Sequence, residues 1–140
     1  MLKISAFIGT AAIAAACAHI TAPTPDGGPP VSLSQGWDEE TRTLFAHTPQ
    51  GSRLMRNAWF RALETPDGAG LFSAPDNLAK YGLIPAQGPS PLNPDDYPIG
   101  FALDPGPEAT RDVGLTCAAC HTATVTVGGR EILIEGAPAH

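Results

Sequence analysis

The chain has 140 residues, and its 8 Lys and Arg residues against 14 Asp and Glu residues give a formal net charge of −6. That length allows one domain at most, and the acidic balance argues against binding to nucleic acid or to anionic lipid. Gly and Pro number 15 each, so long irregular loops are expected and the core is thin.

Residues 1–17 have the pattern of an export signal. Lys3 gives a charged start, and residues 4–16 form an apolar run that is too short to span a bilayer. Cys17 follows three alanines and resembles the lipid-attachment cysteine of bacterial lipoproteins, although an alanine replaces the usual leucine of that motif. The alternative is ordinary cleavage nearby, with Cys17 discarded or left free. We expect export to the periplasm, with membrane attachment through lipid on Cys17.

A flexible tether rich in Pro and Gly is predicted over residues 18–36, followed by one folded unit over 37–140. Helices are predicted over 38–46, 52–64 and 73–81. For the second helix, Ser52 is the expected cap. Its expected buried side comprises Leu54, Met55, Ala58, Trp59 and Leu63.

The segment from 85 to 98 contains five prolines, which exclude a regular element there. Residues 99–103 are apolar and are expected to lie against a bound ligand. Residues 122–127 and 130–135 alternate apolar and polar side chains around Gly128-Gly129, which predicts a β-hairpin. The expected fold class is mainly α, with long Pro/Gly-rich loops and a C-terminal hairpin.

The most specific motif is Cys117-Ala118-Ala119-Cys120-His121. On a helical turn, residues three positions apart share a face, so both thiols can bond to the two vinyl groups along one edge of a porphyrin. The histidine that follows can then offer a nitrogen to the iron. This is the attachment pattern of c-type haem. Cys117 and Cys120 are the predicted thioether anchors, and His121 is the predicted axial ligand.

Three other interpretations of the motif agree less well with the sequence. A zinc site requires four ligands, usually from two such pairs, and the sequence has no second pair. A thioredoxin-like redox pair should follow a strand in a βαβ unit, whereas a Pro-rich loop precedes this motif. A disulfide between Cys117 and Cys120 would leave His121 unexplained.

The sixth ligand of the iron stays open. Met55 is one candidate, although packing in the core also explains it. His47 is a second, although a capping or surface role at a helix end also explains it. His140 is the third, and an open or water-bound position is the alternative. Only nineteen residues follow His121, so the second haem face is covered either by the upstream helices or by residues outside this chain. We expect the second arrangement, in which the haem domain is incomplete.

Several stretches together resemble a family of exported bacterial di-haem cytochromes that contains the rubber oxygenases and is related to the di-haem cytochrome c peroxidases. The resemblance is carried by residues 45–52, 59–64, 77–82, 93–101 and 114–136. It implies that Cys117, Cys120 and His121 hold the first of two haems, within an incomplete cytochrome c-like domain.

The expected function is therefore electron transfer by covalent haem c outside the cytoplasm, with an unidentified redox partner protein. In this interpretation the chain is the N-terminal piece of a larger di-haem cytochrome. The alternative is a haem-dependent peroxidase or oxygenase with an open distal site. A non-catalytic lipoprotein, or a remnant that no longer folds, is the third hypothesis.

Overall fold

The computed structural model describes residues 28–138. The predicted export signal and Cys17 lie outside these residues, as does His140. Among the described residues, no helix is both long and apolar enough to cross a membrane.

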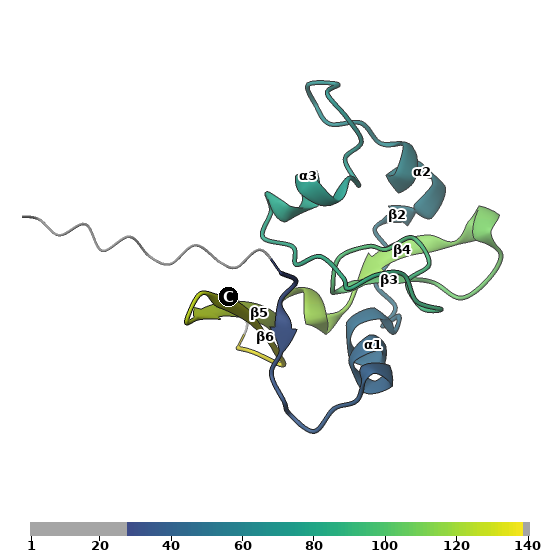
Figure 1. Ribbon diagram of the computed structural model, residues 1–140. Coiled ribbons are helices and arrows are strands. Elements are labelled where there is room, and N and C mark those ends of the chain that lie inside the picture. The colour runs from purple at the N-terminus through teal and green to yellow at the C-terminus, as the bar shows by residue number, and fades with distance from the viewer. Residues whose placement is uncertain (1–27, 139–140) are drawn as a thin grey trace, which may run out of the picture.

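Two small three-stranded sheets form the framework, and the short helix that carries the motif connects them (Figure 1). The first sheet has the order β1-β6-β5, with β1 (Val31–Ser32) parallel to β6 (Arg130–Glu135) and β5 (Thr122–Val127) antiparallel to it. The second has the antiparallel order β2-β4-β3, formed by Met55–Arg56, Asp112–Leu115 and Phe101–Leu103. The part of the predicted tether from Val31 onward therefore packs on the folded unit.

The expectation of a mainly α, cytochrome c-like fold is wrong, because residues 28–138 form a mixed structure with only 23% helix and 24% strand. The helices are short: α1 spans Glu39–His47, α2 spans Asn57–Ala62 and α3 spans Pro75–Ala79. Two 3₁₀ turns, η1 (Glu108–Thr110) and η2 (Cys117–Ala119), complete the helical part. In Figure 1, α1 lies on one side of the second sheet, and α2 and α3 lie on the other.

The predicted first helix is confirmed as α1, and its start has a clear cause. The Asp38 carboxylate accepts a hydrogen bond from the Thr41 amide at 2.8 Å, and Glu39 and Glu40 occupy the first turn. Both features favour a helix N-terminus, since they satisfy a free amide and complement the helix dipole. The predicted hairpin is also confirmed, with β5 and β6 pairing from Thr122 with Glu135 to Val127 with Arg130.

The second predicted helix is wrong over its first half. Residues 55–56 pair with β4 instead, and the Ser52 hydroxyl does not cap a helix but accepts a hydrogen bond from the Leu115 amide at 3.2 Å. The helical spacing of the expected apolar side is therefore broken, and Trp59 is 69% exposed. Phe60 is buried in its place.

The core consists of two clusters. The larger one fills the space between the second sheet, α2 and α3 with Phe60, Leu78, Tyr97, Phe101, Leu103 and Val113. The smaller one, which consists of Ala46, Ile99, Ala118 and Leu133, joins α1, η2 and the first sheet. The apolar stretch 99–103 is thus buried in the protein's own core, and Ala118 fixes the motif directly to it.

Candidate haem-attachment site

The motif lies on a 3₁₀ turn that begins at Thr116. The Thr116 hydroxyl accepts a hydrogen bond from the Ala118 amide at 3.2 Å and donates one to the Ala46 carbonyl at 3.1 Å. The amides of Cys120 and His121 both donate to the Cys117 carbonyl, at 3.2 and 2.9 Å. The Thr116 side chain therefore caps the turn and also attaches it to α1.

A close backbone contact with Gly100 also supports the turn. The Thr116 amide donates to the Gly100 carbonyl at 2.8 Å, and a Cβ atom on Gly100 would lie 2.3 Å from the backbone nitrogen of Ala119. Gly100 also has a φ of +91°, which residues with a side chain rarely adopt. Only glycine fits at this position. Ala118, which is 1% exposed, packs beside it in the smaller core cluster.

The loop after α1 provides a second support. The Gln50 side-chain oxygen accepts a hydrogen bond from the Cys117 amide at 3.0 Å. Gly114 lies so close to this loop that a Cβ atom would be 1.9 Å from the Ser52 carbonyl oxygen. Neither Gln50 nor Gly100 could be recognised from the sequence as a support, because Gln50 is 67 positions from Cys117 and the contacts of Gly100 with residues 116 and 119 leave no local pattern.

Both motif cysteines are free thiols on the surface. In a 3₁₀ helix the side chains at positions i and i+3 eclipse one another, so Cys117 and Cys120 lie on the same side of the turn. Ala118, between them, is buried on the core side. The two sulfur atoms are therefore presented together, away from the core.

His121 is exposed, but its ring is held in place. Its Nδ1 atom lies 2.9 Å from the carbonyl oxygen of Ala137, just beyond the end of β6. Because a carbonyl oxygen can only accept, Nδ1 carries the proton, and Nε2 has the free electron pair. Histidines that bind metals commonly donate their second ring N–H to a backbone carbonyl in this way. The local geometry fits an axial ligand.

The other candidate ligands within the described residues are engaged elsewhere. His47 is 5% exposed, with Nδ1 2.8 Å from the Phe101 carbonyl oxygen and Nε2 3.4 Å from the Asn93 side-chain nitrogen. Its predicted surface role is wrong. Burial lowers the pKa of His47, and the Phe101 carbonyl and the Asp96 charge oppose that shift only in part. Met55 packs against the larger core cluster.

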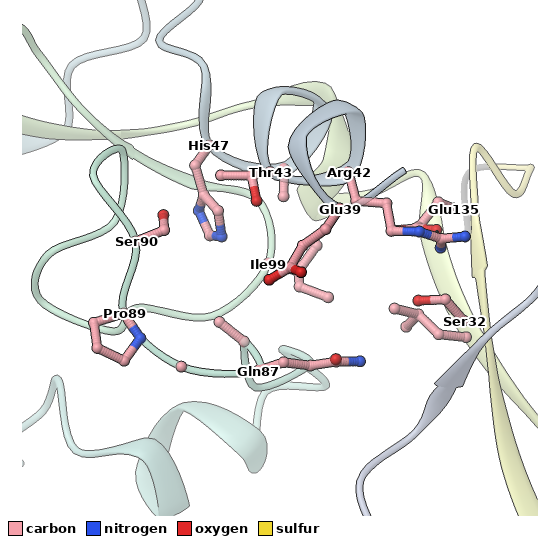
Figure 2. Close-up of a pocket in the computed structure, with 14 residues that line it drawn as sticks. Ser32, Glu39, Arg42, Thr43, His47, Gln87, Pro89, Ser90, Ile99 and Glu135 are labelled. Carbon is pink, nitrogen blue, oxygen red and sulfur yellow. The ribbon is translucent and has the colours of Figure 1, made fainter. Parts of the chain in front are cut away.

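A separate cavity of about 140 Å³ lies between α1, the loop 86–90 and the first sheet (Figure 2). Arg42 and Glu135 form an ion pair at one side of it, and burial raises the pKa of Glu135 although Arg42 opposes the shift. The residues that line this cavity include none of 117–121. The motif residues therefore do not form part of this cavity.

The described residues contain no cluster of three or more His, Cys, Asp or Glu side chains that could hold a metal ion. A haem iron takes most of its ligands from the porphyrin, so its site requires only one or two protein ligands. His121 and the two thiols are the groups that this chain could offer to such a cofactor.

The chain is similar in sequence to a known protein. A protein of Sinorhizobium fredii (strain NBRC 101917 / NGR234), described as uncharacterized protein y4iJ, is 33% identical to the chain over 129 residues. The match covers 76% of this chain and 20% of that protein, so the chain spans about a fifth of the relative's length. No family model and no solved structure matches the chain. The resemblance to di-haem cytochromes stays a prediction.

Proposed function

We propose that this chain binds haem c covalently at Cys117 and Cys120, and that it serves in electron transfer outside the cytoplasm. The observation that carries the proposal is the orientation of His121. Its Nδ1–H group donates to the Ala137 carbonyl, which leaves Nε2 available beside two exposed thiols on a single turn.

The cysteines provide the attachment. Each thiol adds across one vinyl group of the porphyrin, so that a carbon–sulfur bond forms and the thiol proton passes to the other vinyl carbon. The eclipsed positions of Cys117 and Cys120 suit two vinyl groups on one edge of a ring. The hydrogen bonds of Thr116 and Gln50 hold the backbone of the turn, so it is preorganised for this chemistry.

His121 provides the axial nitrogen. The Ala137 carbonyl fixes its tautomer and its ring orientation, and it also makes Nε2 a stronger donor to a metal. When bound, haem iron carries one electron by changing between its ferrous and ferric states. The acidic chain, with a net charge of −6, suits a basic redox partner protein.

The second candidate function is a haem-dependent peroxidase or oxygenase. The positions of Met55 and His47 favour this candidate, because they make either side chain a poor sixth ligand. Met55 packs against the larger core cluster, and both ring nitrogens of His47 have partners. Neither side chain can serve as the sixth ligand without leaving these contacts. An open sixth position would admit a small exogenous ligand. Binding of cyanide to the ferric protein supports this candidate, and a low-spin spectrum that ignores cyanide counts against it.

The test is expression of the full chain with the haem-attachment machinery of a bacterial periplasm. The product should be coloured, with separate α and β bands after reduction. The variant Cys117→Ala/Cys120→Ala should lose the covalent haem, whereas the matched variant Cys17→Ser should keep it. A colourless wild-type product with the mass of the bare polypeptide would show that the proposal is wrong.

The same Cys17 variant tests the proposed lipid anchor. With lipid on Cys17, the wild-type protein sediments with membranes, and Cys17→Ser releases it into the soluble fraction. Equal amounts of both proteins in the soluble fraction would remove the anchor from the proposal and leave the haem site untouched.

A further inference from the structure

The cavity between α1, the loop 86–90 and the first sheet has the size of a small-molecule site. Its volume is about 140 Å³, and a protein cavity of about 150 Å³ can hold benzene, so a ligand of about six non-hydrogen atoms fits. Figure 2 shows Glu39 and His47 extending from α1 toward the loop with Pro89 and Ser90. The helix face that lines the cavity consists of residues three or four positions apart, namely Glu39, Arg42, Thr43, Ala46 and His47.

The strong hydrogen-bond donors of the lining are already occupied. Arg42 pairs with the Glu135 carboxylate through Nη1, and its Nη2 donates to two carbonyls of the segment 33–37 at 3.2 and 3.4 Å. The side-chain nitrogen of Gln87 donates to the Pro30 carbonyl at 3.1 Å. The hydroxyl groups of the lining can either donate or accept, so few committed donors remain for a ligand.

The acceptors, in contrast, are largely available. The Glu39 carboxylate has no hydrogen bond or ion pair with any described residue. His47 is 5% exposed, and its Nδ1 donates to the Phe101 carbonyl, so Nε2 has the free electron pair. The one partner of Nε2 among the described residues is the Asn93 side-chain nitrogen, at 3.4 Å. That distance is longer than a usual hydrogen bond, and the same nitrogen donates to the Tyr97 carbonyl at 2.8 Å.

The charges of the lining favour a cation with several atoms. Two carboxylates, those of Glu39 and Glu135, face the single guanidinium group of Arg42. Burial lowers the pKa of His47, so its ring adds no positive charge at neutral pH. Among the described residues, no three His, Cys, Asp or Glu side chains are close enough together to hold a metal ion, so the free acceptors do not meet at one atom.

We infer that the cavity binds a small amino alcohol, whose ammonium group pairs with the Glu39 carboxylate and whose hydroxyl group donates to Nε2 of His47. Glu39 is exposed and His47 is buried, so this orientation keeps the charged end of the ligand near water and its neutral end inside the protein. The carbon chain between the two ends lies against Ile99 and Leu133, the larger aliphatic side chains of the lining.

The spacing of the two acceptors selects the length of the ligand. Glu39 and His47 are the first and last residues of α1, which places them roughly 12 Å apart along the helix axis. A straight amino alcohol with four carbons has roughly 6 Å between nitrogen and oxygen, and a hydrogen bond of about 2.9 Å at each end gives the same span.

NMR titration of the full chain with this four-carbon amino alcohol tests the site. A dissociation constant of about 1 mM is expected for a probe of six non-hydrogen atoms. Two matched probes separate the two contacts, because n-butylamine lacks the hydroxyl group and the corresponding diol lacks the charge. Each should bind about fivefold more weakly, since each loses one of the two contacts with the protein.

Matched variants identify the place of binding. Glu39→Gln removes the charged acceptor and should weaken binding of the amino alcohol about fivefold. Glu40→Gln is the control, because Glu40 lies in the same first turn of α1 but does not line the cavity. The imidazole signals of His47 should shift more with the amino alcohol than with n-butylamine, which has no hydroxyl group for Nε2.

The inference is overturned if the amino alcohol does not bind, or if either matched probe binds as tightly as it does. Equal losses in Glu39→Gln and Glu40→Gln would also overturn it, since they would place the amine on the acidic first turn of α1 and outside the cavity. None of these results contradicts the proposed haem attachment, because residues 117–121 do not line the cavity.

Discussion

The Nδ1 atom of His121 donates to the carbonyl oxygen of Ala137 at 2.9 Å, and this bond joins the two ends of the β5–β6 hairpin. The hairpin is therefore part of the candidate haem site, because it determines which imidazole nitrogen is available for iron.

Removal of Ala137, whose carbonyl accepts the hydrogen bond from His121, tests the role of this bond. A chain that ends after residue 136 should still attach haem, but its midpoint potential should rise, because His121 loses the partner that strengthens its donation to ferric iron. The matched control ends after residue 138, which keeps Ala137 and removes His140. Equal potentials for all three chains would contradict the role of the Ala137 carbonyl. A changed spin state in the control would identify His140 as the sixth ligand.

Gly100 should tolerate no side chain. Gly100→Ala places a Cβ atom 2.3 Å from the backbone of Ala119 at a φ of +91°, and we expect a loss of about 3 kcal/mol of unfolding free energy with poor haem attachment. Gly106→Ala is the matched control, since Gly106 also has a positive φ, but nothing lies within 4 Å of the added atom. It should lose only about 1 kcal/mol. Denaturant unfolding measures both losses. Similar losses of unfolding free energy in the two variants would show that the contact between Gly100 and η2 does not affect stability.

The local sequence determined some elements and not others. Asp38 with Glu39 and Glu40 predicts α1, and Gly128-Gly129 between alternating residues predicts the hairpin, because each signal acts within a few positions. The second sheet depends instead on pairing of Met55 with Val113, which are far apart in the chain. Helical periodicity around Ser52 was therefore misleading, since a tertiary partner converts that segment to a strand.

The candidate site also contains some residues that the local sequence identifies and others that depend on distant partners. The proposed attachment residues are visible in the sequence because covalent haem attachment requires these residue types at this spacing. Their supports are not visible, because the Ala137 carbonyl is a backbone group that every residue has, and Gln50 acts only through its place in the fold. The burial of His47 was also missed, since the end of a short helix gives no sign of what packs on it.

The stability of the protein should depend on pH through His47. Its pKa is lowered in the folded state relative to its ordinary value of 6.5, so the unfolded chain binds a proton more readily. The stabilisation is complete above pH 6.5 and is lost as the pH falls below it, with a slope of at most about 1.4 kcal/mol per pH unit.

His47→Gln is the matched comparison for this effect, because it keeps a donor for the Phe101 carbonyl and cannot titrate. The difference in unfolding free energy between wild type and variant should narrow from pH 7 to pH 5. The raised pKa of Glu135 gives a slope of opposite sign, but it is common to both proteins and cancels. If the difference in unfolding free energy between wild type and variant did not change with pH, the lowered pKa of His47 would be contradicted.

Thr122 offers a stabilising substitution. Its hydroxyl oxygen is buried without a hydrogen-bond partner among the described residues. A buried polar group without a partner is costly, so Thr122→Val, which has nearly the same shape, should raise the unfolding free energy by about 1 kcal/mol. Urea unfolding measures the change. Destabilisation would show that the hydroxyl has a partner in the folded protein.

The most direct test of the haem site is mass spectrometry of the tryptic peptide between Arg111 and Arg130, taken from exported protein. The proposal predicts that residues 112–130 carry one haem joined to both Cys117 and Cys120, so that neither cysteine reacts with an alkylating reagent. A peptide of unmodified mass, with both cysteines alkylated, would contradict it.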